Sequence, residues 1–160
     1  MRRVGGRPCA RLREIATEYA ALLRSAFGNR LVSVVLYGSV ARGDARPGSD
    51  INVLVVADAI APGPFKRRDL VDAADQAVAP LVAAAAMDGI PTRLARIVKT
   101  PEEAREIQPL YLDLTQDAVL LYDRDGFFAR VLDGVRASLE RLGATRTGDG
   151  HPRYWRLPSP

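Results

Sequence analysis

The sequence contains few of the residues that build disulfide scaffolds, zinc sites or histidine-based catalysis. Cys9 is the single cysteine and His151 the single histidine among 160 residues. One cysteine excludes an internal disulfide and a cysteine-based zinc site, and it fits a reducing, cytoplasmic setting. We do not expect His151 to be catalytic, because it lies in a stretch rich in glycine, proline and arginine.

Long hydrophobic runs are also missing. No apolar stretch approaches the roughly 20 residues that a membrane-spanning helix needs. The N-terminal arginines are not followed by the apolar core of a signal peptide. We therefore expect no membrane partner. The length and the 48% hydrophobic content are typical of one globular domain with a core of its own.

Lysine is scarce, since Lys66 and Lys99 are the only two, so arginine supplies nearly all the positive charge behind the formal net charge of +4. Arginine binds phosphate as a bidentate fork, which makes an acidic partner or a nucleotide one interpretation of this composition. The alternative is a coding bias toward arginine and alanine. No interleaving of aromatic and basic residues supports a nucleic-acid partner.

The hydrophobic pattern predicts helices alternating with strands. The expected helices span Pro8–Phe27, about Phe65–Met87 with a kink or restart at Pro80, a short one from Thr100, Leu110–Thr115 and Gly126–Leu142. Four apolar runs rich in β-branched residues predict strands at Leu31–Tyr37, Ile51–Ala57, Thr92–Val98 and Ala118–Tyr122.

This order predicts an α/β (α+β) fold, a mixed sheet of about four strands flanked by helices. The connection from Gly38 to Ser49 is too short for a parallel crossover, so at least one strand pair should be antiparallel. Arg93 and Arg96 favour an edge position for the third strand. We divide the chain into a domain at 1–143 and a mostly irregular tail at 144–160, which packs on the domain or extends from it.

The stretch between the first two strands carries the polar groups most suggestive of chemistry. Gly38 lets the backbone approach a ligand closely, Ser39 offers a hydroxyl, and the amides of the next helical turn point outward as anion donors. Asp50 and Asn52 lie two residues apart at the start of a strand, so both side chains lie on the same face of the sheet, at the end of the strand that solvent reaches. We expect Ser39 and Asp50 to open on one cleft.

This stretch resembles the motif of the DNA polymerase beta-like nucleotidyltransferases, most closely their small stand-alone branch, in the order Gly38-Ser39-x-Ala41-Arg42-Gly43 and then Ser49-Asp50-Ile51-Asn52. The resemblance implies a nucleotidyltransferase fold. It also implies Mg²⁺-dependent transfer of a nucleotidyl group from a nucleoside triphosphate to an acceptor hydroxyl. Its site residues would be Gly38, Ser39, Arg42 and Ser49 for nucleotide binding, and Asp50 and Asn52 for catalysis and metal binding.

Two positions depart from that motif. The family carries an aspartate where this chain has Asn52, whose amide oxygen ligates a cation without adding charge. The third carboxylate expected on Thr92–Val98 is missing, and Arg93 and Arg96 stand there instead. Transfer activity is therefore expected to be weak. The alternative is an inactive relative that binds nucleotide or a partner protein, as an antitoxin does beside a small helical toxin.

The remaining polar residues of interest have plainer interpretations. Arg93 and Arg96 either replace the charge of a metal ion in binding phosphate or face solvent. We expect the third strand to lie beside Ile51–Ala57, with no carboxylate from elsewhere completing the metal site. The structural roles expected of other residues are a turn brace for Arg42, surface exposure for Asp44, helix capping for Glu102 and Glu103, turn formation for Asp123 and Asp125, and cover of an apolar patch for Tyr154 and Trp155.

Overall fold

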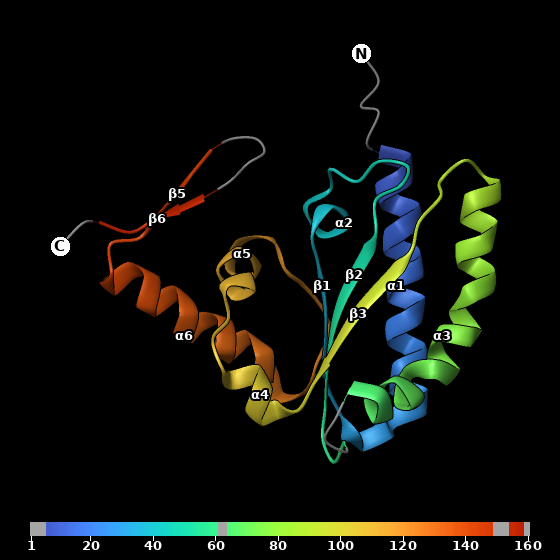
Figure 1. Cartoon of the computed structure of the whole chain (residues 1–160), viewed down its shortest axis with the longest axis horizontal. Helices are drawn as coiled ribbons and strands as arrows, with labels where there is room; N and C mark the ends of the chain where they lie inside the picture. Colours follow the sequence, from blue (N-terminus) through green and yellow to red (C-terminus); the bar gives the residue numbers. More distant parts are fainter. Residues whose placement is uncertain (1–5, 61–63, 149–153, 159–160) are drawn as a thin grey trace.

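Two groups of helices cover opposite faces of a central sheet (Figure 1). The computed structural model describes residues 6–60, 64–148 and 154–158, so His151 lies outside the described residues. One face is covered by α1 (Gly6–Phe27) and α3 (Pro64–Met87). The other is covered by α4 (Pro101–Arg105), α5 (Pro109–Asp117) and α6 (Phe127–Arg141).

The sheet contains β1 (Leu31–Tyr37), β2 (Ile51–Ala57), β3 (Leu94–Lys99) and β4 (Val119–Asp123), in the order β3-β2-β1-β4. β1 pairs antiparallel with both β2 and β4, whereas β2 and β3 are parallel and are joined through α3. The mixed α/β sheet and the antiparallel pair are thus confirmed, and β3 lies at an edge beside β2 as expected.

Both central strands are buried on two faces, which explains their nearly unbroken apolar sequence. Along β2, Val53 and Val55 enter the core with α1 and α3. Leu54 and Val56 enter the core with α4, α5 and α6. Because side chains alternate along a strand, Asn52 lies on the second face, at the end where β2 begins.

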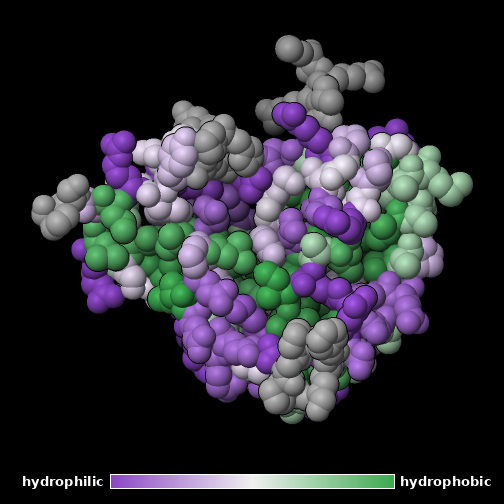
Figure 2. Space-filling view, in the orientation of Figure 1, coloured by the Kyte–Doolittle hydropathy of each residue, from purple (hydrophilic) through white to green (hydrophobic). Residues whose placement is uncertain are grey.

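Helix α3 differs from the sequence expectation in two ways. It continues through Pro80 as one helix, so of the expected kink or restart the restart does not occur, and the kink stays a prediction. By length and composition its stretch from Arg67 to Met87 would also be able to cross a membrane, which the sequence analysis did not expect. In this structure Val71, Ala74 and Val78 are buried in the core shared with α1, and hydrophobic residues reach the surface over α3 in Figure 2.

The C-terminal segment forms a hairpin that the sequence analysis did not predict. Its strands are β5 (Thr145–Thr147) and β6 (Tyr154–Arg156), which pair antiparallel in a sheet of their own. Trp155 packs against the core on the α4–α6 side, and its Nε1 donates to Oδ1 of Asp113 at 3.3 Å. The tail therefore packs on α5, and Trp155 covers apolar surface of its own domain.

Candidate functional site

Gly38 and Asn52 bring the turn after β1 against the start of β2. Gly38 has a φ of +79°, and Ser39 begins the short helix α2 (Ser39–Arg42). Tyr37 pairs with Asn52 across the two strands. A Cβ atom at Gly38 would lie 2.9 Å from Nδ2 of Asn52, so only glycine fits both the backbone angle and the contact. The turn and the Asp50–Asn52 segment thus meet at one end of the sheet.

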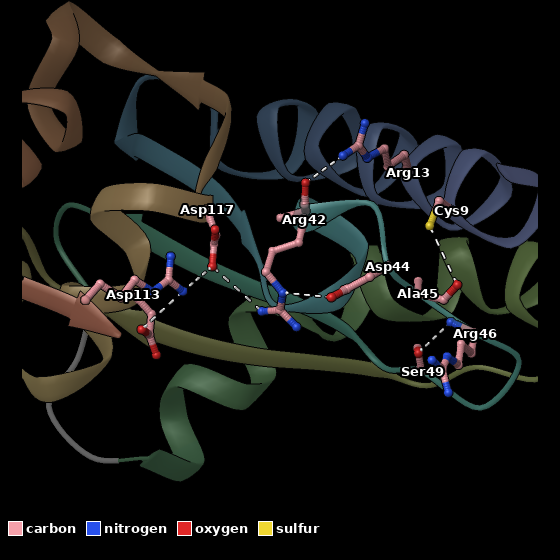
Figure 3. Close-up of polar contacts among 11 residues, drawn as sticks. Cys9, Arg13, Arg42, Asp44, Ala45, Arg46, Ser49, Asp113 and Asp117 are labelled. Carbon is pink, nitrogen blue, oxygen red and sulfur yellow. Dashed lines mark hydrogen bonds and ion pairs between the residues drawn. The ribbon is translucent and has the colours of Figure 1, made fainter. Parts of the chain in front are cut away.

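Arg13 of α1 holds the far end of this turn. Its Nε donates to the carbonyl of Val40 at 3.0 Å, and its Nη2 donates to that of Ala41 at 2.6 Å (Figure 3). Such carbonyls at the end of a helix lack partners within the helix, so the guanidinium satisfies them. Sequence analysis missed Arg13 because it belongs to another helix, 27 residues before Val40.

Asp50 is balanced by an arginine from the neighbouring strand. The Ile51 amide donates to the Arg93 carbonyl at 2.8 Å, which brings the two chain segments together. Nη2 of Arg93 donates to Oδ2 of Asp50 at 2.7 Å. The Arg93 side chain is 78% exposed and that of Asp50 is 32% exposed. Every arginine is a cation at physiological pH, and the hydrogen bond to Asp50 raises the pKa of the Arg93 guanidinium further.

Arg96 lies on the other face of the sheet. Its Nη2 lies 2.5 Å from Oδ2 of Asp75 and 3.7 Å from Oδ1 of Asp72, both on α3. Tyr19 of α1 donates its hydroxyl to the same Asp75 at 2.7 Å, and burial raises the pKa of this tyrosine. Strand alternation therefore separates the two arginines that the sequence placed together, and Arg93 alone remains beside Asp50.

The side chains around Asp50 that could ligate a metal do not fit a site for two metal ions. Asn52 contributes an amide, and its partner across the parallel pair on β3 is Ala95, which offers no ligand. No group of three or more histidine, cysteine, aspartate or glutamate side chains that could hold a metal ion occurs among the described residues. Magnesium binds through carboxylates and phosphates, and Arg93 already neutralises the single carboxylate here. Mg²⁺ binding by Asp50 and Asn52 stays a prediction.

Local contacts engage two of the predicted nucleotide-binding residues. Nε of Arg42 donates to Oδ2 of Asp44 at 3.3 Å, and its Nη1 lies 3.9 Å from Oδ2 of Asp117 (Figure 3). The Ser49 hydroxyl accepts a hydrogen bond from the Arg46 amide at 2.9 Å. Arg42 thus braces the turn as expected, and Asp44 is exposed. The roles of Arg42 and Ser49 toward a nucleotide stay predictions.

A small cavity of about 90 Å³ separates the turn from α5, and it is lined by Tyr37, Gly38, Arg42, Leu110, Asp113, Leu114 and Asp117. This volume is below the roughly 300–1,000 Å³ of small-molecule sites, so this cavity by itself does not hold a nucleotide. Sequence analysis did not single out Asp113, which lies within the short helix expected at Leu110–Thr115, or Asp117, which lies just beyond it.

The comparisons with known proteins agree with this architecture. Residues 17–125 match the model of the nucleotidyltransferase domain family. A candidate protein adenylyltransferase from Methanocaldococcus jannaschii is 27% identical over 133 residues, or 82% of this chain and 85% of that protein. The crystal structure of a candidate nucleotidyltransferase from Sulfolobus solfataricus superposes with a TM-score of 0.52 at 23% identity. That alignment covers 78% of this chain and 92% of the other.

Proposed function

Because the chain belongs to the nucleotidyltransferase domain family, we propose that it binds a nucleoside triphosphate at the turn formed by Gly38 and Ser39. The observation that carries this proposal is the close approach of Gly38 to Asn52, which leaves no room for a Cβ at Gly38. It holds the half-exposed Ser39 at the end of the sheet where Asp50 and Arg93 also meet. A backbone turn, a hydroxyl and an exposed guanidinium together suit a polyphosphate.

Transfer of the nucleotidyl group to an acceptor hydroxyl is a second candidate function. Family membership and the retained Asp50 favour it. In this reaction the acceptor oxygen attacks the α-phosphorus and pyrophosphate leaves. Asp50 is the only carboxylate of the motif that this chain keeps, and it is paired with Arg93. We therefore expect nucleotide binding to be retained and transfer to be slow or absent.

Calorimetric titration with ATP tests the binding proposal. Ser39→Ala should weaken ATP binding about tenfold or more, since a hydrogen bond to a charged group contributes about 1.5–3 kcal/mol and 1.4 kcal/mol is a factor of ten. Ser25→Ala is the matched control, because Ser25 is exposed on α1. If wild-type protein binds no ATP, with or without Mg²⁺, the proposal is wrong.

Turnover separates the two candidates. The protein is incubated with ATP labelled at the α-phosphate, Mg²⁺ and protein or RNA acceptors, and acceptor labelling is measured. We expect no labelling above that of an Asp50→Asn variant. Labelling by the wild type that is lost in Asp50→Asn would establish nucleotidyl transfer as the function.

A further inference from the structure

The charges at the open end of the sheet differ from those of a metal-binding centre. Asp50 contributes one negative charge, Asn52 and Ala95 contribute none, and Arg93 contributes one positive charge. The arginine and aspartate lie 2.7 Å apart, so their charges cancel in the absence of any ion. A divalent cation at Asp50 would have to compete with a guanidinium that already makes a charge-assisted hydrogen bond to Oδ2.

We propose that Arg93 takes the place of a divalent cation at this site, so that a triphosphate binds to it without magnesium. This inference rests on the proposed nucleotide binding at the Gly38–Ser39 turn. A guanidinium has five N–H donors in a planar fork, and Nη2 uses one of them on Asp50. With 78% of its side chain exposed, Arg93 presents donors to solvent that phosphate oxygens accept.

Arg42 and Arg96, two other arginines of this region, are paired with different acids. Arg96 is paired with Asp72 and Asp75 on the opposite face. Arg42 is directed at Asp44 and Asp117, on the α5 side of the turn (Figure 3). Arg93 is paired with the motif's own carboxylate and is the most exposed of the three, so it is best placed to meet an incoming phosphate.

ATP titrations with and without metal test the inference. In EDTA, wild-type protein should bind ATP at least as tightly as it binds Mg-ATP, because chelation by Mg²⁺ reduces the charge that Arg93 meets. Arg93→Gln should lower the affinity measured in EDTA about tenfold or more. Arg105→Gln is the matched control, since Arg105 is 60% exposed on α4 at the other end of β3. Binding that requires Mg²⁺ and that Arg93→Gln leaves unchanged would overturn the inference.

A metal titration decides the same question without nucleotide. Electron paramagnetic resonance of Mn²⁺ at millimolar concentration should show no ion bound by the wild type. Arg93→Asp, which adds a second carboxylate beside Asp50, should gain Mn²⁺ binding. Mn²⁺ bound by the wild type and lost in Asp50→Asn would overturn the inference. Failure of ATP binding in every condition would instead refute the proposed function. The Mn²⁺ titration would still show whether Arg93 or a divalent ion neutralises Asp50.

Discussion

Asn52 illustrates how one atom changes the electrostatics of a site while its shape is kept. Aspartate and asparagine have nearly the same volume, so β2 accepts either in its packing. The amide contacts Gly38 and carries no charge, which leaves Asp50 and Arg93 as a balanced pair. A carboxylate at position 52 would bring a second negative charge to the start of β2, beside Asp50. Two carboxylates so close repel unless a cation lies between them.

Asn52→Asp should therefore destabilise the protein without metal by about 1 kcal/mol, or about 2–4 °C in melting temperature for a chain of this size. Mg²⁺ should restore the loss in the variant and leave the wild type unchanged. Differential scanning fluorimetry with and without Mg²⁺ measures both effects. Asn29→Asp adds the same charge at an exposed position and serves as control. If Mg²⁺ raises the melting temperature of the wild type equally, Asn52 is a working ligand.

At the scale of elements, Asp123 joins β1, β4 and α6. Gly126 precedes α6 and has no side chain to cap the helix, so Asp123 accepts hydrogen bonds from the Phe128 and Ala129 amides at 2.8 and 3.0 Å. It also accepts the hydroxyl of fully buried Ser33 at 2.6 Å. The turn role expected for Asp123 thus extends to a helix cap and a cross-strand bond.

Asp123→Ala should lower the free energy of unfolding by roughly 2–4 kcal/mol, the sum of a lost helix cap and a buried hydroxyl left without its acceptor. Urea denaturation measures the change. Asp133→Ala removes a 70% exposed carboxylate from the same helix and should change stability by less than about 0.5 kcal/mol. Similar losses in both variants would contradict this account.

Glu103 links α4 to α3 and makes stability depend on pH. Its carboxylate accepts two hydrogen bonds of 2.7 Å from Arg67. The helix-capping role expected of Glu103 takes the form of a capping box with Thr100. The Arg67 hydrogen bonds, and then that of the Thr100 amide, lower the pKa of Glu103 below 4.5. A carboxylate whose pKa is lowered on folding stabilises the protein above its unfolded pKa and loses this contribution as pH falls through the folded value.

Wild-type protein should therefore lose more stability than Glu103→Gln as pH is lowered below about 4.5, and the two should converge in strong acid. Urea midpoints measured from neutral pH downward test this. Glu102→Gln is the control, because the Glu102 side chain is 78% exposed. Parallel pH profiles for wild type and Glu103→Gln would show that the ion pair contributes nothing.

At the scale of the whole molecule, a series of ion pairs connects the C-terminal hairpin to the turn formed by Gly38 and Ser39. Arg146 of β5 lies 2.9 Å from Oδ2 of Asp117 and 3.6 Å from Oδ1 of Asp113. Asp117 in turn lies 3.9 Å from Arg42. The hydrogen bond to Asp117 raises the pKa of Arg146. The hairpin thus covers α5 and neutralises acids that would otherwise repel a triphosphate at the turn.

Arg146→Ala should reduce the free energy of unfolding by about 1–3 kcal/mol, because Arg146 and Asp117 are only 20% and 15% exposed. It should also loosen the hairpin and shift the emission of Trp155, the single tryptophan, to longer wavelength. Arg156→Ala removes an exposed arginine from β6 and should leave both readouts unchanged. Unchanged emission in Arg146→Ala would mean that the hairpin is held without the ion pairs of Arg146.

The sequence by itself determined the central strands, the turn at Gly38 and the helix start at Thr100 with its capping acids. These features rest on short-range patterns, such as β-branched runs, glycine conformation and hydrogen bonds between residues three apart, which are readable without the fold. The motif from Gly38 to Asn52 also identified the family, since its order and spacing lie within one stretch of chain. The hairpin β5–β6 was missed because neither strand has more than three residues.

Only the tertiary structure decided which charges meet at the site. Arg93 and Arg96 are three residues apart, so strand alternation already places them on opposite faces. Only the packing of α3 and the strand order decide that Arg96 meets Asp72 and Asp75 while Arg93 pairs with Asp50. The Asp50–Arg93 contact joins residues 43 apart, and it exists because β2 and β3 pair in parallel register. A contact of that range depends on how helices and strands pack, which no local pattern specifies.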